Sequence, residues 1–544
     1  MKKFFLSLLL VNGLATGLYA QSVSINTDGS TPDASSILDI KSTGKGLLIP
    51  RMTGTQRTSI STPATGLLVF DTDSKSFWHY DGTAWINLSA GWSLNGNDGT
   101  DSSRFIGTTD YTPLFFRVNS ELSGQIGLAG GNTALGFRTL TANTSGTDNL
   151  ALGWGALYTN TTGSRNISLG SGTLQFNTTG ANNTATGYQA MFLNSAGDVN
   201  TAMGYQSLYS NATGVGNTAI GAETLVLNTF GSGNTATGWQ SMYANTTGTH
   251  NTAAGYQSLL LNTTGSGNTA NGTGALQHNM TGNRNTASGY YSLAGNTIGE
   301  NNTTVGALSL LSNTIGTANT AMGAQSLQSN TSGSGNVAAG FSSLLLNTTG
   351  VDNTALGRQA LNTNNTGMYN TATGASAMFL NTTGARNTAN GLNSMFSNTE
   401  GADNSATGFQ ALLSNTVGTW NTADGANALA NNTTGVFNTA VGYQAMNGVV
   451  DGNQNTGIGA FCTTSATNLT NSTAIGYNTV VDASNKVRVG NTAVTVIEGQ
   501  VSFTTPSDGR FKYNVREDVR GLDFILQLRP VTYQFDVKKF DAQL

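Results

Sequence analysis

Two residues near the C-terminal end of the sequence could act together as a nucleophile and a base. Ser507 and Lys512 lie five residues apart, in the segment Ser-Asp-Gly-Arg-Phe-Lys. A serine hydroxyl becomes a nucleophile once a base takes its proton, and a lysine can be that base when burial lowers its pKa. A bend at Gly509 would be needed to bring the two side chains together. The chemistry open to such a pair is attack on a peptide bond.

Residues 132–488 offer little else for catalysis. This stretch holds ten acidic residues, of which only Glu400 and Asp403 lie close together in sequence. Glycoside hydrolysis needs two carboxyl groups about 5–10 Å apart, and we interpret this pair as solvated turn residues. His250 and His278 have no acidic or cysteine neighbours. We therefore expect no enzymatic activity in this part of the chain.

The composition excludes several classes of protein. The 544 residues include 70 glycines but only 23 Lys and Arg and 27 Asp and Glu, with a net charge of −4. A nucleic-acid surface needs clustered Lys and Arg, so we expect no nucleic-acid partner. Three His and one Cys are too few for a zinc or iron–sulfur centre, and Cys462 has no partner for a disulfide within the chain. We expect neither a metal nor a cofactor.

The first 20 residues predict a secretory signal peptide. A basic start, Met1-Lys2-Lys3, precedes the apolar run from Phe4 to Val11, and Ala20 is a small residue suited to cleavage before Gln21. No later stretch approaches 18 apolar residues, so we expect no transmembrane span. These features predict a secreted protein, extracellular or held at the cell surface.

A 17-residue repeat fills the middle of the chain, from Asn132 to Arg488. These 357 residues hold 21 copies of Asn-Thr-Ala-x-Gly-x-x-Ser-Leu-x-x-Asn-Thr-Thr-Gly-x-x, with no insertion or deletion. Position five of this consensus is Gly in all 21 copies, position nine is Leu or Met in 19, and position 12 is Asn in the first 18. A fixed period of this kind indicates a stack of similar structural units.

The repeat is too short for a helix pair and has no apolar stripe of helical period. Thr favours strands, whereas Gly and Asn suit tight turns. We therefore expect an all-β fold, a parallel β-roll or β-solenoid of 21 coils, each coil pairing with the next at about 4.8 Å, so that the rod is roughly 100 Å long. Asn stacked on Asn at position one would form an amide ladder. Gly at position five would take a positive φ or lie close to the next coil.

The core of such a rod is thin. Each coil supplies an Ala at position three, a Leu or Met at position nine, and a variable residue at position four. So little apolar burial hardly offsets the entropy lost on ordering 17 residues. Association of several chains along the rod would add the missing burial, and we expect a homotrimer.

The repeats resemble the head repeats of YadA-like trimeric autotransporter adhesins. Those repeats pair an Asn-x-Ala-x-Gly element with a second short strand, and matching elements stand at 132–136, 217–221 and 353–357. The resemblance implies a left-handed parallel β-roll and a trimer. The period here is a few residues longer per coil, and membrane anchoring and autotransport are not carried over.

The segments on either side of the repeats have other compositions. Residues 21–90 read as a small β-rich module, with strands predicted at 46–52 and 66–70 and a hairpin at 76–88 around Asp81-Gly82. This module resembles the N-terminal module of bacterial secreted tail-fibre-like proteins. Residues 91–131 read as a β-rich adaptor, and residues 489–506 as a linker or neck.

Residues 507–544 change character, because 13 of these 38 residues are charged, against 17 of 357 in the repeats. Ser-Asp-Gly-Arg-Phe-Lys, an apolar helical pattern at 521–528 and Pro530-Val531-Thr532-Tyr533 resemble the start of the intramolecular chaperone domain of endosialidase-type tail spikes and fibres. The resemblance implies an α+β domain, here truncated, that helps chains to trimerise and then cuts the chain before Ser507, with Lys512 as the base. The alternative is a folding cap without cleavage.

Several functions fit these features. We interpret the chain as a secreted, trimeric structural fibre or adhesin-type surface protein, and a phage-type tail fibre is an alternative. Position six is aromatic in 11 of 21 copies, so a carbohydrate-binding face that docks a surface glycan or another host-surface ligand is a second alternative; packing between coils or chains would also explain the aromatic residues. Thr recurs at positions two and 13, which leaves ice binding as a third.

Overall fold

The computed structural model of the protein describes residues 22–88, 106–110, 112–127, 130–500 and 526–528. The chain divides into two units, Met1–Asp110 and Tyr111–Leu544, and each is described by itself. The predicted signal peptide lies outside the described residues, and so does nearly all of the predicted chaperone segment.

The first unit contains two small sheets. β1 (Val23–Asn26) pairs in parallel with β2 (Leu38–Lys41). A four-stranded sheet contains β3 (Arg51–Met52), β4 (Leu68–Asp71), β5 (Ser76–Tyr80) and β6 (Trp85–Asn87). The strand predicted at 46–52 is therefore only two residues long, whereas the predicted hairpin is present as β5 and β6. Asp81 fixes its turn, because its carboxylate accepts the backbone N–H groups of Thr83 and Ala84, each at 2.7 Å.

A single turn of helix, α1 (Gly54–Thr58), connects β3 to β4. The Oγ1 atom of Thr53 accepts the N–H of Gln56 at 3.2 Å, and the Gln56 side chain accepts the N–H of Thr53 at 2.9 Å. This reciprocal pair satisfies two of the donors that every helix start leaves free. No helix within the described ranges is long and apolar enough to cross a membrane.

The second unit begins with an antiparallel hairpin, β7 (Leu114–Val118) and β8 (Glu121–Ile126). β8 pairs antiparallel with β9 (Thr133–Leu135), the strand of the first repeat. The hairpin thus covers the first rung of the stack, which would otherwise present an unpaired strand edge.

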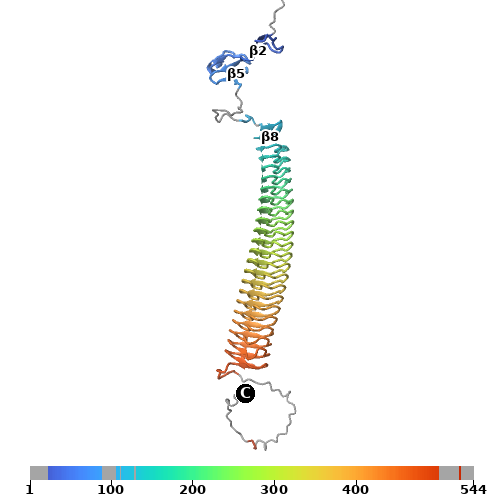
Figure 1. Ribbon diagram of the computed structural model, residues 1–544, viewed down its shortest axis with the longest axis vertical. Helices are drawn as coiled ribbons and strands as arrows, with labels where there is room; N and C mark the ends of the chain where they lie inside the picture. Colours follow the sequence, from blue (N-terminus) through green and yellow to red (C-terminus); the bar gives the residue numbers. More distant parts are fainter. Residues whose placement is uncertain (1–21, 89–105, 111, 128–129, 501–525, 529–544) are drawn as a thin grey trace, which may run out of the picture. The chain divides into compact units, whose positions relative to one another are not determined.

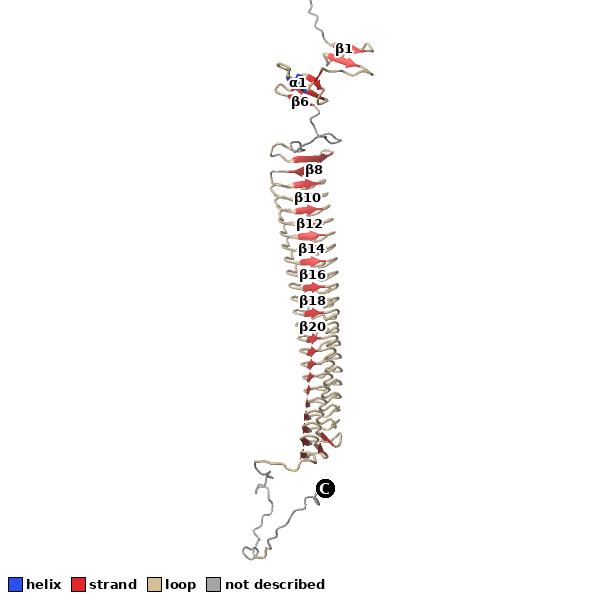
Figure 2. Ribbon diagram, turned by 90° about the vertical axis from the view of Figure 1, so that its left-hand side faces the viewer, coloured by secondary structure: helices blue, strands red, loops and turns tan. Residues whose placement is uncertain are grey.

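Each repeat forms one coil, with a short strand at positions two to four. The strands pair in parallel, so that residues 17 apart in the sequence lie opposite each other. Figure 1 shows the coils of this unit stacked in sequence order, and Figure 2 shows their strands in one line along the stack. The predicted all-β solenoid is therefore confirmed. After β9, the strands are β10 (Leu150–Leu152), β11 (Ile167–Leu169), β12 (Thr184–Thr186), β13 (Thr201–Met203), β14 (Thr218–Ile220), β15 (Thr235–Thr237), β16 (Thr252–Ala254), β17 (Thr269–Asn271), β18 (Thr286–Ser288), β19 (Thr303–Val305), β20 (Thr320–Met322), β21 (Val337–Ala339), β22 (Thr354–Leu356), β23 (Thr371–Thr373), β24 (Thr388–Asn390), β25 (Ser405–Thr407), β26 (Thr422–Asp424), β27 (Thr439–Val441) and β28 (Thr456–Ile458).

The stack ends less regularly than it begins. β30 (Thr473–Ile475) and β32 (Val487–Val489) continue the ladder of strands, while β29 (Thr463–Thr464) pairs with β31 (Val480–Val481) beside it. β32 follows β30 after 14 residues instead of 17. The ladder therefore has more coils than the 21 predicted, because the end of the last repeat forms another strand instead of a turn.

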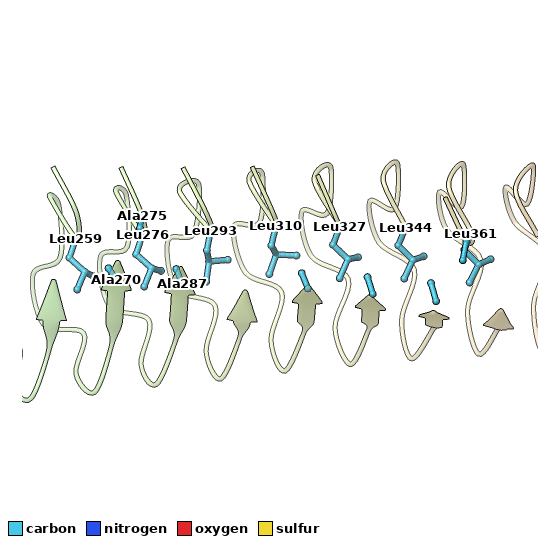
Figure 3. Packing of buried hydrophobic residues seen from close by; sticks show 14 of the residues in the cluster. Leu259, Ala270, Ala275, Leu276, Ala287, Leu293, Leu310, Leu327, Leu344 and Leu361 are labelled. Atoms are coloured by element: carbon cyan, nitrogen blue, oxygen red, sulfur yellow. The ribbon is translucent and has the colours of Figure 1, made fainter. Parts of the chain in front are cut away.

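The core is a single column of small and medium apolar side chains. The Ala at position three and the Leu or Met at position nine are fully buried along nearly the whole stack. In Figure 3, Leu259, Leu276 and Leu293 point from the loops into the space between loop and strand, beside Ala270 and Ala287. The thin core predicted from the sequence is therefore confirmed for positions three and nine. The prediction that position four also lies in the core is wrong, because alternation along the strand turns this residue to the outside while position three points inward.

Asn at position one forms the predicted amide ladder. Asn319 donates its backbone N–H to the Oδ1 atom of Asn302, in the preceding coil, at 3.0 Å, and its Nδ2 donates to the same oxygen at 3.2 Å. The Nδ2 group also donates to the carbonyl oxygen of Gly333 at 2.9 Å. These Asn side chains are fully buried, so the ladder satisfies polar groups that water does not reach.

A second ladder was not predicted from the sequence. Asn at position 12 repeats the arrangement: Asn330 Nδ2 donates to Asn313 Oδ1 and to the carbonyl of Gly333, each at 2.9 Å. The carbonyl of Gly333 therefore accepts hydrogen bonds from both ladders. A Cβ atom at this glycine would collide with Asn330 Oδ1 and with the carbonyl of Gly350, which explains Gly at position 15.

Candidate functional site

The predicted nucleophile and base, Ser507 and Lys512, lie outside the described residues. Their approach to each other, and cleavage before Ser507, therefore stay predictions.

The acidic pair of the repeats does not form a catalytic arrangement. Asp403 binds Arg386 of the preceding coil through two hydrogen bonds, of 2.7 Å from Nε and 2.9 Å from Nη2. The Arg386 guanidinium holds the pKa of Asp403 below its ordinary value. Glu400 is exposed. Asp403 thus stabilises the contact between two coils at the surface, where such pairs contribute little.

The aromatic residues at position six form a column along the surface of the rod. Their side chains remain about half exposed, as Trp154, Trp239 and Tyr290 are at 51%, 53% and 57%. Some neighbours in this column touch: the rings of Tyr188 and Tyr205 are stacked with centroids 5.8 Å apart, and those of Trp239 and Tyr256 lie 5.4 Å apart. Packing between coils therefore accounts for only part of their surface. The rest is open to a ligand or to another chain.

The outer face of the strand ladder is almost free of charge. Positions two and four point outward, with Thr at most of the former and apolar residues at many of the latter. Met203, Ile220 and Met322 at position four are 46%, 41% and 47% exposed. Asp424 is the one charged residue at position four between 132 and 488. A long, flat, weakly polar sheet face is a surface suited to contact with another protein chain.

The Thr hydroxyls at position 13 are engaged within the rod. Thr246 Oγ1 donates to the carbonyl of Thr263 in the next coil at 2.9 Å, and Thr331 Oγ1 donates to that of Thr348 at 3.1 Å. One of the two Thr columns that suggested ice binding therefore stabilises the contact between coils.

In the first unit, α1 covers one face of the four-stranded sheet. Arg57, in α1, is buried and its Nε donates to Asp71 Oδ2 at 3.0 Å. The same guanidinium lies 3.7 Å from the centre of the Trp78 ring. Val69 lies directly opposite Trp78 and on the same face as Asp71, and it is buried. We call this face, with Val69, Asp71 and Trp78, the covered face.

The opposite face of this sheet carries apolar side chains, and no helix covers it among residues 22–88 and 106–110, which the structure describes in this unit. We call it the open face, and its residues are Arg51, Leu68, Phe70, Phe77, His79, Ile86 and Leu88. Phe77, Ile86 and Leu88 are 46%, 41% and 58% exposed. A groove of about 160 Å³ opens on this face between Phe70, Phe77 and the segment 47–51. Sequence reasoning found the strands but did not distinguish these two faces.

Two family models match the chain. Residues 24–102 match the phage tail like trimerisation region, and residues 507–543 match the chaperone of endosialidase. These two segments are similar to parts of tail-fibre-type proteins. No curated protein matches the chain. The two matches support a trimeric protein with a C-terminal chaperone domain, as the sequence predicted, whereas the resemblance of the repeats to YadA-like heads and their left-handed sense stay predictions.

Proposed function

We propose that this protein is exported and acts outside the cell or on its surface as a trimeric structural fibre. In this proposal, residues 21–90 and 91–131 hold the chains together and join them to the rod, residues 132–488 are a stiff spacer, and residues 489–506 are a neck. Residues 507–544 assist assembly.

The observation that carries the proposal is the combination of an unbroken coil ladder with a trimerisation region before it. Backbone hydrogen bonds connect each coil to its neighbours, and two Asn ladders reinforce these connections along most of the stack, so the rod resists bending. Its core contains only Ala at position three, Leu or Met at position nine and, in some coils, a second Ala at position eight, and its sheet face is exposed. Association of three rods would bury that face and add the apolar contacts that one rod lacks.

Sedimentation velocity and light scattering on the full chain test the proposal. We expect three times the mass of one chain and a frictional ratio well above that of a globular particle. A monomer, or a compact particle, would overturn it.

We also propose that the C-terminal segment cuts the chain before Ser507, with Lys512 as the base. The support is the sequence Ser-Asp-Gly-Arg-Phe-Lys at the start of the segment that matches the chaperone of endosialidase. Mass spectrometry of the full-length gene product, expressed beside Ser507→Ala and Lys512→Ala, tests this step. We expect a fragment that begins at Ser507 in the wild type and in neither variant. If the wild type stays intact, the cleavage step is contradicted, and the alternative, a folding cap that does not cut the chain, takes its place.

A second candidate function is glycan binding along the rod, favoured by the half-exposed aromatic column. Sugar rings stack on exposed aromatic faces, and position six presents such a face in 11 of the 21 copies. A glycan array probed with the wild type and with Trp239→Ala tests it. Trp420→Ala is the matched control, because Trp420 is equally exposed at 53% but lies in another column, stacked on Phe437. A glycan signal that Trp239→Ala loses and Trp420→Ala keeps would support this function. If the wild type itself gives no signal, the function is contradicted.

A further inference from the structure

The sheet of the first unit has one apolar face that α1 does not cover. Directly opposite residues on neighbouring strands point to the same side of a sheet. The register places Leu68, His79 and Ile86 in one row across β4, β5 and β6. A second row continues from Arg51 through Phe70 to Phe77. Every residue in these two rows belongs to the face that α1 leaves free.

The open face combines an apolar surface with an unsatisfied polar atom. Phe70 and Phe77 pack edge to face with ring centroids 5.2 Å apart, yet Phe77 remains 46% exposed. Leu47 and Leu48, beside the groove, are 66% and 78% exposed. The Nδ1 atom of His79 is buried and has no hydrogen-bond partner among the described residues. A buried nitrogen of this kind needs a partner, because an unmade hydrogen bond costs free energy.

We propose that the open face is the surface through which three copies of this chain associate at their N-terminal ends. The occupant is a second copy, because the segment that carries the face, within residues 24–102, matches a trimerisation region. The inference rests on the proposed trimeric fibre and names the surface that holds it together. Around a three-fold axis, Phe77, Ile86 and Leu88 of each chain bury against the other two.

The covered face is unsuited to this role. Its polar groups are satisfied within one chain, because Arg57 is bound to Asp71 and stacked on Trp78. α1 itself is polar at its surface, with Thr55 and Gln56 exposed. Association through that side would bury these polar groups with no new partner.

Cysteine cross-linking in the full chain tests the inference. Ile86→Cys places one thiol on the open face, and Thr55→Cys places one on α1 as the matched control. The native Cys462 is buried, and burial raises the pKa of its thiol, so the wild type gives a low background. A short bismaleimide should join Ile86→Cys chains into covalent dimers on a denaturing gel, since one thiol per chain can link only two of three copies. Thr55→Cys should stay monomeric on the gel.

Light scattering on the same samples separates the possible outcomes. A trimer with dimers from Ile86→Cys alone supports the open face. A trimer in which Thr55→Cys cross-links, or in which neither variant does, overturns this interface and leaves the trimeric fibre standing. A monomer overturns the fibre as well. Leu88→Cys, on the same face but opposite Phe77, replaces Ile86→Cys if circular dichroism shows that the latter does not fold.

Discussion

Gly323 illustrates why position five of the repeat is glycine in every copy. Its φ is 126°, in the region that side chains avoid. A Cβ atom there would lie 2.7 Å from the carbonyl oxygen of Gly340 in the next coil. Both reasons predicted from the sequence, a positive φ and a close approach, therefore apply at once.

We expect Gly323→Val to destabilise the rod by about 2–6 kcal/mol, from backbone strain and overpacking together. Gln325→Ala, two residues away, removes one surface hydrogen bond, from Ser342 at 3.1 Å, and should cost far less. Thermal melts of the two variants measure the difference. Equal, small effects would contradict the role given to Gly323.

Ala318 shows the same constraint at a position where the sequence is not glycine. Its φ is 57°, and it is exposed at position 17, where other copies carry Gly216 or Gly335 at similar φ values. We expect Ala318→Gly to stabilise the rod by about 0.5–1 kcal/mol, because glycine takes this conformation without strain. Ala324→Gly, at a position without positive φ, should destabilise it by a similar amount. Denaturant melts measure the free energy of unfolding of both variants. If both substitutions change it in the same direction, the role given to the positive φ of Ala318 is contradicted.

Asp71 gives the first unit a dependence on pH. The backbone N–H of Ser74, with the guanidinium of Arg57, holds the pKa of Asp71 below its ordinary value of 3.8. A lowered pKa in the folded state stabilises the fold above pH 3.8, and this contribution disappears as the pH falls toward the folded pKa. We expect Asp71→Asn to weaken hydrogen-exchange protection of β4 and β5 at pH 7. The difference in protection between Asp71→Asn and the wild type should become smaller below pH 3.8. A difference that becomes larger there would contradict the stabilising role given to the Asp71 carboxylate.

At the scale of the coil, the Asn ladders hold neighbouring coils together. Asn319 connects three coils, because its side chain also accepts the backbone N–H of Asn336 at 3.0 Å. Asn319→Ala would leave the N–H of Asn336 buried without that acceptor, and an unsatisfied buried group costs about 1–3 kcal/mol.

We therefore expect Asn319→Ala to lower the melting temperature of the rod clearly. Ser329→Ala in the same coil is the control, because the Ser329 side chain is only partly buried. Circular dichroism melts of both variants provide the comparison. A melt of Asn319→Ala that overlays that of Ser329→Ala would show that the ladder is not needed for stability.

At the scale of the whole molecule, we expect assembly to depend on segments outside the rod. Deleting residues 507–544 should lower the yield of trimer, because the segment matches a chaperone and three thin rods must meet in register to bury their sheet faces. Size-exclusion chromatography with light scattering on refolded full-length and shortened chains measures the yield. An unchanged yield would remove the assembly role from this segment.

The sequence by itself determined the coil. Identical residues every 17 positions must occupy identical places once each strand pairs with the next, so the period specified the parallel ladder, the thin Ala and Leu core and the Asn ladder at position one. Gly at position five followed from the same logic, because an invariant residue without a side chain marks a place where no side chain fits.

The tertiary structure decided what depends on closing the coil and on the partner of each face. Leu327, at position nine, has a φ of 51° while fully buried, although leucine disfavours this conformation locally by about 1–2 kcal/mol; closing the coil and burying the side chain outweigh that preference. The second Asn ladder depends on positions one and 12 meeting at one glycine carbonyl, which residue spacing does not reveal. Likewise, strand alternation gave β4 and β5 two faces, but only the packing of α1 decided which of them stays open, because that choice depends on contacts between residues distant in the sequence.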